Sequence, residues 1–325
     1  MAIEVLKPGL ATTVQDAGRE GYYHLGIPPS GALDQYSFRA ANLLVGNDET
    51  SAALECALLG PELRFRDPAI VAVTGADMAP RVNGDNAPAN EAFPVRAGDV
   101  LSFAFLKGGA RAYVAVAGGI DVAPVLGSRS TYALGALGGF SGRALQGGDV
   151  IPVGQHGPDA RAGRKLAPEL RQPLAREVEL RCIPGLYDHR LAEQSARDFY
   201  EDTWSVAPEA DRIGYRFRHG RPLKFRERKQ PFGAGSDPSN IVDACYPIGS
   251  IQVPGGLEPI VLHRDAVSGG GYAMIGTVIG ADMDLIAQLQ PNNKARFVAV
   301  DLEQALVARQ EYRARLDRLR AALCT

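Results

Sequence analysis

Short runs of apolar and β-branched residues recur along the chain, and Gly, Pro, Asp or Asn residues separate them. Runs of this length with turn residues at both ends are typical of β-strands rather than helices. We predict strands at residues 3–6, 69–73, 100–105, 111–117, 177–183, 260–262, 272–279 and 295–300. The dipeptide Asn83-Gly84 predicts a hairpin turn. The pattern therefore indicates a mainly β protein.

Helical periodicity is confined to three places. Asp34 can cap a helix over residues 35–45, which ends at a glycine, and a weaker pattern covers residues 188–200. Asp301 and Gln304 form an approximate capping box that opens a C-terminal helix. The apolar stripe of that helix consists of Leu302, Leu306, Leu316, Leu319 and Leu323. Its opposite face is rich in arginine, as is common for a solvated helix face.

A polar stretch rich in proline and arginine, residues 155–176, interrupts the rhythm of strands, and we place a linker at residues 161–176. The sequence EVLKPGL at residues 4–10 resembles LRCIPGL at residues 180–186, so the two halves open alike. A chain of 325 residues is long enough for two domains. We predict one mostly β domain at residues 1–160 and a second at 177–325, which includes the C-terminal helix.

Composition excludes several classes of function. Apolar residues make up 46% of the chain, which argues against disorder, and the formal charge of −2 argues against a general nucleic-acid binder. No run approaches the ~20 apolar residues of a membrane span, and the start of the sequence does not read as a secretory signal. We therefore expect a cytoplasmic protein without a membrane or nucleic-acid partner.

Metal and nucleotide chemistry also lack support in the sequence. Four cysteines and five histidines are scattered without the spacing of a metal site, so we expect no metal and interpret the cysteines as buried thiols in a reducing cytoplasm. Neither a phosphate-binding glycine loop nor a dinucleotide-binding fingerprint occurs, so we expect no tightly bound cofactor. No nucleophile elbow supports a hydrolase triad.

Candidate anion-binding groups lie in the first half of the chain. A stiff Pro-Pro turn brings Ser30 and Gly31 to the start of a predicted helix, where unpaired N–H groups attract anions, and Arg39 adds a charge. The alternative is a rigid loop without a ligand, which the local pattern favours. Arg129, between Ser128 and Ser130, and Arg143 offer planar donor forks for a carboxylate or phosphate. The sequence supports equally well the alternative that both arginines bind backbone carbonyls in tight loops.

Candidate acid–base groups lie in the second half. Asp211 and Arg212 place an acid beside a base, and His263 and Asp265 precede a run of three glycines. Asp265 is suited to act as a base or to orient an amide, and His263 can titrate near neutral pH. The alternative is that these residues end strands and make turn hydrogen bonds.

At these residues the sequence resembles a known family. The matching segments, in family order, include residues 26–34 (GIPPSGALD), 41–47 (ANLLVGN), 126–132 (LGSRSTY), 138–143 (GGFSGR), 211–215 (DRIGY), 251–254 (IQVP) and 270–272 (GGY). The family comprises carboxyltransferase-type proteins related to the C-terminal part of urea carboxylase. It is also known as the KipA-like family, allophanate hydrolase subunit 2 or the C subunit of bacterial 5-oxoprolinase.

The resemblance implies two cyclophilin-like β-barrel domains and a KipI-like partner subunit, often with a LamB/YcsF-like subunit. It implies a role in an ATP-dependent complex that hydrolyses a lactam such as 5-oxoproline, with the ATP used by the complex. One alternative is carboxyl transfer to urea or a small amide, which requires a separate biotin carrier. Another is a non-catalytic antagonist of a KipI-like kinase inhibitor. The matched segments add Gln252, Ser268, Gly270 and Tyr272 to the expected substrate-binding residues, with Asp265, Ser30 and Arg129 as the expected catalytic ones.

The sequence departs from the family in two places. Where the family carries Gln-Thr-Thr-Gly-Gly-Tyr, this chain reads VSGGGY at residues 267–272, and the late Pro-Gly-Asp is replaced by PNN at residues 291–293. The lost amide and hydroxyl favour a changed substrate or a non-catalytic role. If the chain is catalytic, we expect Ser30, Arg129 and Asp265 to converge in one cleft between the two domains, within about 15 Å.

Overall fold

The computed structural model describes residues 1–324, which form two compact units. Unit 1 consists of Met1–Arg19, Ser30–Leu174 and the C-terminal residues from Arg313 onward. Unit 2 consists of Glu20–Pro29 and Ala175–Tyr312. The main passage between the units lies between Leu174 and Ala175. The domains at residues 1–160 and 177–325 and the linker at residues 161–176 stay predictions.

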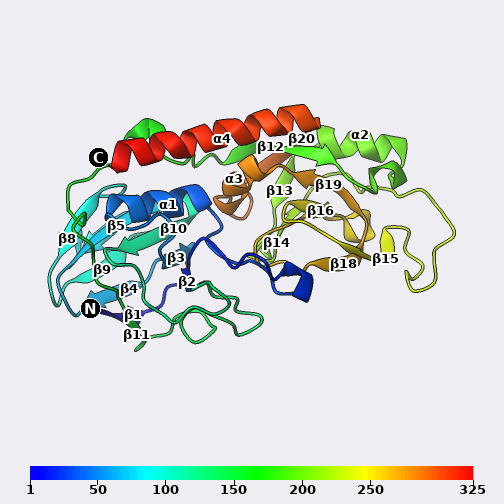
Figure 1. The fold of residues 1–325 in the computed structure, drawn as a ribbon. Helices are drawn as coiled ribbons and strands as arrows, with labels where there is room; N and C mark the ends of the chain where they lie inside the picture. The colour runs from blue at the N-terminus through cyan, green and yellow to red at the C-terminus, as the bar shows by residue number, and fades with distance from the viewer. Residues whose placement is uncertain (325) are drawn as a thin grey trace. The chain divides into compact units, whose positions relative to one another are not determined.

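Unit 1 contains two antiparallel sheets (Figure 1). The six-stranded sheet has the order β11-β1-β4-β9-β6-β7, with bounds Val150–Pro152, Ala2–Lys7, Glu62–Phe65, Val100–Phe103, Pro80–Val82 and Asp85–Asn86. The five-stranded sheet has the order β2-β3-β10-β5-β8, with bounds Ala11–Gln15, Ala53–Ala57, Gly108–Val116, Ala69–Asp77 and Ala92–Val95. Asn83 and Gly84 both have positive φ, 53° and 92°, and join β6 to β7. The predicted hairpin turn is confirmed.

The five-stranded sheet is covered on both faces. Along β10, Val114 and Val116 belong to an apolar cluster with residues of the six-stranded sheet, whereas Tyr113 and Ala115 pack with α1 (Gln35–Leu44) on the other face. Because successive strand side chains point to opposite faces, a strand covered on both sides becomes a nearly continuous apolar run. This explains why residues 111–117 read as uninterrupted apolar sequence.

Helix α1 begins and ends where its sequence predicts. The Asp34 carboxylate accepts a hydrogen bond from the Ser37 N–H at 2.9 Å, and Gly46 follows the last turn with a φ of 78°. The second half of α4 (Leu302–Leu323) also lies in unit 1, where Leu319 and Leu323 join the apolar cluster of α1. Leu302 and Leu306 are instead 63% and 47% exposed. The predicted leucine stripe is therefore buried only over its second half.

Unit 2 is built on a closed barrel of seven strands in the order β12-β19-β16-β17-β14-β13-β20. The bounds are Glu177–Pro184, Met274–Val278, Ser250–Gln252, Ile260–Leu262, Gly214–Arg218, Trp204–Val206 and Lys294–Ala299. The first and last of these strands, β12 and β20, pair in parallel and close the barrel, whereas the other pairs are antiparallel. A closed barrel leaves no unpaired sheet edge.

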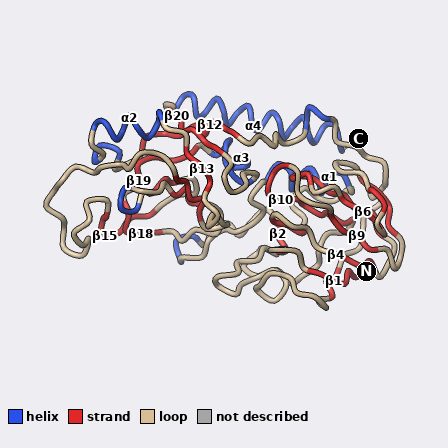
Figure 2. The backbone as a smooth tube through the Cα atoms, turned by 180° about the vertical axis from the view of Figure 1, so that it is seen from behind, coloured by secondary structure: helices blue, strands red, loops and turns tan. Residues whose placement is uncertain are grey.

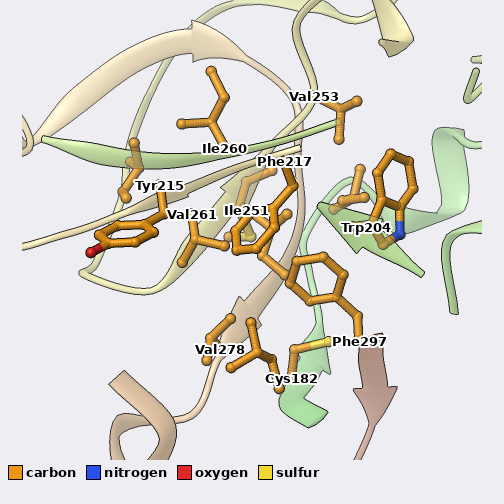
Figure 3. Packing of buried hydrophobic residues seen from close by; sticks show 14 of the residues in the cluster. Cys182, Trp204, Tyr215, Phe217, Ile251, Val253, Ile260, Val261, Val278 and Phe297 are labelled. Atoms are coloured by element: carbon orange, nitrogen blue, oxygen red, sulfur yellow. The ribbon is translucent and has the colours of Figure 1, made fainter. Parts of the chain in front are cut away.

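Large aromatic and branched side chains fill the interior of unit 2 (Figure 3). Phe297 stacks on Phe199 with ring centroids 4.6 Å apart. Phe217 packs edge-on against Phe297, with ring centroids 5.5 Å apart. Trp204 is fully buried, and its indole N–H donates to the Phe199 carbonyl at 3.1 Å. The apolar core of the barrel of unit 2 is thus shielded from water.

The remaining elements of unit 2 lie around the barrel. They are the two-stranded sheet of β15 (Asn240–Cys245) and β18 (Gly269–Tyr272), and the helices α2 (Glu193–Glu201) and α3 (Met283–Ala287). The helix predicted at residues 188–200 starts later, because the Ala192 N–H donates to the Lys224 carbonyl at 2.8 Å and Leu191 bridges to Phe225. Single turns of 3-10 helix occur at Tyr23–Leu25, Pro168–Leu170, Asp188–Arg190, Pro254–Gly256 and Gly280–Asp282.

The architecture confirms the prediction of a mainly β protein with few helices and a C-terminal helix (Figure 2). A closed barrel is present in unit 2, whereas the strands of unit 1 form two sheets. Within residues 1–324, no helix is long and apolar enough to span a membrane.

Candidate functional site

Ser30 and Gly31 of the Pro-Pro-Ser-Gly loop belong to unit 1 and pack tightly against the turn that follows β2. Ser30 and Gly31 adopt left-handed backbone conformations with φ of 52° and 87°, and Ser30 is fully buried. The Gly31 N–H donates to the Gln15 side-chain oxygen at 3.1 Å. A Cβ atom at Gly31 would lie 2.8 Å from the backbone of Gly18, so only glycine fits there.

A buried glutamate, which the sequence analysis did not single out as a site residue, anchors the end of this loop. Glu55 on β3 is 2% exposed and accepts hydrogen bonds from the Leu33 N–H and the Tyr113 hydroxyl, both at 2.8 Å. The Arg111 Nε lies 3.6 Å from the second carboxylate oxygen of Glu55. Burial and the charge of Glu55 raise the pKa of Tyr113 well above its ordinary value. The donors around Glu55 compensate its burial and fix the entry to α1.

Asp16 organises the Gly-Ser-Arg-Ser loop. Its carboxylate accepts hydrogen bonds from the Ser128 hydroxyl at 2.7 Å, the Arg129 N–H at 2.5 Å and the Ser130 hydroxyl. Ser128 and Ser130 are both buried. Asp16 directly follows β2 and stands in the turn sequence DAG at residues 16–18. Ser128 and Ser130 therefore shape the loop through Asp16.

The arginines predicted to bind an anion in unit 1 contact this chain's own groups. Arg129 donates to the Asp121 carboxylate at 3.0 Å and to the Val122 carbonyl at 2.8 Å. Arg143 binds both oxygens of the Asp149 carboxylate at 2.8 Å, which lowers the pKa of Asp149.

Arg39 forms an ion pair with Glu49. The Glu49 carboxylate also accepts a hydrogen bond from Arg320 at 2.8 Å. Hydrogen bonding from Arg320 is the main cause of the lowered pKa of Glu49. A ligand at Arg39, Arg129 or Arg143 must compete with these internal contacts, and their substrate-binding roles stay predictions.

The candidate acid–base residues of unit 2 come together. Asp265 is 5% exposed, and its two carboxylate oxygens accept from the Nε and Nη2 atoms of Arg212 at 2.8 and 3.1 Å. The neighbouring Asp211 carboxylate accepts from the N–H groups of Ile213 and Gly214, as expected of a residue that shapes a turn. Each Asp265 oxygen keeps a further lone pair, so the carboxylate can still accept a proton or an amide N–H.

The segments taken from the family resemblance meet around Tyr246. Its hydroxyl donates to the Tyr272 carbonyl, its N–H donates to the Ser268 carbonyl at 2.9 Å, and its phenol hydrogen-bonds with Gln252. A Cβ at Gly270 would lie 3.1 Å from the Gln252 amide nitrogen and 3.5 Å from the Tyr246 ring. Tyr246 is 1% exposed, and burial raises its pKa. Four predicted residues thus gather about one tyrosine that sequence reasoning missed.

Ser30 and Arg129 lie in unit 1 and Asp265 in unit 2, and their predicted convergence in one cleft stays a prediction. Unit 1 also holds a cavity of about 310 Å³ between α1, β5 and residues 166–174, and none of the predicted site residues lines it. Among residues 1–324, no three His, Cys, Asp or Glu side chains are grouped to hold a metal.

Comparison with known proteins places these residues in a family context. The family described as "Carboxyltransferase domain, subdomain A and B" matches residues 25–299. The C subunit of 5-oxoprolinase from Escherichia coli is 35% identical over 317 residues, which cover 98% of this chain and 97% of that protein. The urea amidolyase of Lachancea kluyveri is also 35% identical, over 98% of this chain and 18% of the relative.

A solved structure shows the same fold. The crystal structure of the urea amidolyase of K. lactis matches with a TM-score of 0.89 and 35% identity, over 98% of this chain and 20% of that chain. The chain thus spans about a fifth of the length of the amidolyases that it matches. It spans nearly the whole of the C subunit of the Escherichia coli 5-oxoprolinase.

Proposed function

Because this chain belongs to the carboxyltransferase-domain family, we propose that it is a subunit of a 5-oxoprolinase-type complex that hydrolyses a lactam at the expense of ATP. The observation that carries the proposal is the reciprocal coverage with the C subunit of the Escherichia coli 5-oxoprolinase, 98% and 97% of the two chains. The complex also contains a KipI-like and a LamB/YcsF-like subunit. ATP acts in the complex and is not held tightly by this chain alone.

The residues of unit 2 supply suitable chemistry for this role. Opening a lactam adds water across the amide bond: the water oxygen bonds to the carbonyl carbon, the carbon–nitrogen bond breaks and the nitrogen gains a proton. Asp265, oriented by Arg212, can accept the proton of the attacking water or hold the lactam N–H. Gln252 and the glycines of β18, which belong to the same unit, offer polar groups for positioning an amide.

The decisive experiment is reconstitution. Purified KipI-like and LamB/YcsF-like proteins, 5-oxoproline and ATP are incubated with this chain, and glutamate formation is followed. We expect glutamate only when all components are present. Glutamate no higher than in the reaction without this chain would overturn the proposal.

A matched pair of variants tests the site within that assay. Asp265→Asn should lower the rate about a hundredfold if Asp265 transfers a proton. The exposed Glu303 on α4 provides the control Glu303→Gln, which should leave the rate unchanged. Equal rates for the two folded variants would remove Asp265 from catalysis and favour a non-catalytic role of the chain, such as binding a KipI-like kinase inhibitor.

A second candidate function is biotin-dependent carboxyl transfer to urea or a small amide. It is favoured by the TM-score of 0.89 to the urea amidolyase of K. lactis. The biotin would be attached to a carrier outside residues 1–325, because these residues contain no Met-Lys-Met biotinylation site. The test supplies a carrier carboxylated with labelled bicarbonate and follows the label. This function would be excluded if the rate at which label leaves the carrier were the same with and without urea and this chain.

A further inference from the structure

Unit 2 contains a buried arginine whose charge no carboxylate neutralises. Arg190 is 6% exposed, and its Nη2 atom donates to the carbonyls of Pro238 and Asn240, the latter at 3.1 Å. Its Nε and Nη1 atoms are buried and have no hydrogen-bond partner in the part of the chain that the structure describes. A buried cation with unused donors is costly unless an anion completes its contacts.

A second arginine lies beside the first. The Nη2 atom of Arg228 donates at 3.2 Å to the same Asn240 carbonyl that Arg190 uses. Burial and the neighbouring charge of Arg228 lower the pKa of Arg190. Within residues 1–324, neither guanidinium makes an ion pair with a carboxylate. Two like charges therefore share one neutral acceptor, and Arg228 is exposed to solvent.

The backbone holds these positive charges in place. Residues 224–229 read KFRERK, four basic residues and one acid, and run beside residues 190–192. The Arg226 N–H donates to the Arg190 carbonyl at 2.8 Å. Nearby Arg221, in contrast, pairs with three carboxylates, those of Asp198, Glu201 and Asp202. The uncompensated charge is thus a local property of Arg190 and the segment after Arg221.

The arginine pair borders the polar cluster of the candidate site. The guanidinium carbon of Arg190 lies 5.6 Å from the centre of the Tyr187 ring, in cation–π contact. The positive charge of Arg190 also acts on the buried phenol of Tyr246, which contacts Gln252 and β18. Arg228 belongs to residues 219–239, which connect β14 to β15 (Figure 1).

We propose that Arg190 and Arg228 form a binding site for the oxyanion group of a small molecule, a carboxylate or a phosphate. One ligand oxygen accepts from the exposed guanidinium of Arg228, and a second accepts from an unused donor of Arg190, Nε or Nη1. An anion also brings a charge opposite to that of the two guanidinium groups, which the neutral carbonyls do not supply. The assignment of the carboxylate to a lactam substrate rests on the proposed function, whereas anion binding itself does not.

The test is a calorimetric titration of the full chain at low salt. The probes are inorganic phosphate, 5-oxoproline and 2-pyrrolidinone, which has the same lactam ring without the carboxylate. We expect saturable binding of phosphate, of 5-oxoproline or of both, and none of 2-pyrrolidinone. Preference between the two anions distinguishes a phosphate ligand from a carboxylate ligand.

Variants connect binding to the two arginines. Arg228→Met should weaken anion binding about tenfold or more, as expected for a charge-assisted hydrogen bond. The control Arg197→Met changes an exposed arginine of α2, which pairs with Glu193, and should leave binding within about twofold of the original. Arg190→Met should abolish binding and Arg190→Lys should restore part of it. Because Arg190 is buried, its variants are interpreted only if circular dichroism shows the native fold. If they do not fold, the result for Arg228→Met alone decides whether the arginines bind the anion.

Three results would overturn the proposal: no saturable binding of either anion, equal binding of 2-pyrrolidinone, or an Arg228→Met variant that binds like the original. The outcome is separable from that of the reconstitution assay. Anion binding that depends on Arg228, in a chain that yields no glutamate with its partners, would reject the proposed function and leave the anion site standing.

Discussion

A buried carboxylate is stable only where donors surround it, and Glu55, Asp16 and Asp265 are surrounded in different ways. Glu55 receives a backbone N–H and a phenol and lies near Arg111, whereas Asp16 receives two hydroxyls and an N–H from one loop. Asp265 receives both donors from one guanidinium. Only the last arrangement leaves a carboxylate whose orientation depends on a single side chain.

Removal of the charge of Glu55 should destabilise unit 1. Glu55→Gln leaves the buried Arg111 without its carboxylate, and loss of one partner of a buried pair costs about 3 kcal/mol. Urea unfolding measures the change in the free energy of unfolding. The control Glu62→Gln breaks an exposed pair with Lys7 and should cost about 0.5 kcal/mol or less. Equal stability of the two variants would contradict this account of Glu55.

The conformation of Gly31 gives a second test at the same scale. Gly31→Ala places a Cβ 2.8 Å from the backbone of Gly18 at a φ of 87°, so we expect a loss of about 2–3 kcal/mol. Gly84→Ala has a similar φ of 92° with nothing within 4 Å of the new atom, and should cost about 1 kcal/mol. Chemical denaturation of both variants separates the steric clash from the backbone strain. A Gly31 variant no less stable than the Gly84 variant would show that the loop can relax.

At the scale of elements, local hydrogen bonds stabilise helix ends and loops, and residues close in sequence form them. At the start of α4, the Gln304 N–H donates to the Asp301 carboxylate at 2.8 Å, and the Asp301 N–H donates to the Gln304 side chain at 3.0 Å. The predicted capping box is thereby confirmed. Residues 143–149 are closed in a comparable way by Arg143 and Asp149.

Loss of the capping box should weaken α4. Asp301→Ala removes the acceptor of the Gln304 N–H, and removal of such a cap costs about 1 kcal/mol. Thermal and urea unfolding monitored by circular dichroism measure the effect. Glu303→Ala, in the same turn but outside the box, is the matched control and should cost less. A larger effect at Glu303 would mean that the cap does not hold the helix start.

The Arg143–Asp149 pair predicts a dependence of stability on pH. Because the pKa of Asp149 is lowered in the folded chain, its contribution is present above about pH 4, the ordinary aspartate pKa, and is lost as the pH falls through the lower folded value. Arg143→Met removes the main cause of the lowered pKa. Its stability should therefore approach that of the original chain as the pH falls from 5 to 2. Urea midpoints measured across this range test it, and parallel curves would contradict it.

At the scale of the whole molecule, a nearly neutral chain carries uneven local charge. The formal charge is −2, yet residues 224–229 hold four basic side chains and one acid. Several arginines elsewhere, among them Arg39, Arg143 and Arg212, pair with carboxylates of the same chain. Only the folded arrangement distinguishes those arginines from Arg190.

The distribution of thiols is also a property of the whole fold. Cys56 and Cys182 are buried, and burial raises the pKa of each to about 12, whereas Cys245 and Cys324 are exposed. A thiol reagent at neutral pH should therefore modify two cysteines in the native chain and four after denaturation, because the thiolate is the reactive form. Mass spectrometry of labelled peptides identifies the sites. Rapid native labelling of Cys56 or Cys182 would show that its core opens readily.

Much of the fold was predictable because its signals are local. The strand at residues 260–262 and the turn at Asn83-Gly84 depend on neighbouring residues and on backbone conformations that few residues adopt. The helix over residues 188–200 was predicted to start too early, because the pairing of Ala192 with Lys224 joins residues far apart in sequence. The same limit applied to the candidate site, where Asp16, Glu55 and Tyr246 acquire their roles only through distant partners.

The sequence by itself determined the mainly β class, the capped helices and the family, because strand periodicity, capping residues and ordered motifs are written in consecutive positions. Tertiary structure alone decided which polar groups are already satisfied. Arg129 and Arg143 look like open donor forks in the sequence, yet each meets a carboxylate of this chain, whereas Arg190 resembles any surface arginine and is buried without one. The physical reason is that the charge balance of a side chain depends on neighbours in space, which only the folded chain assembles.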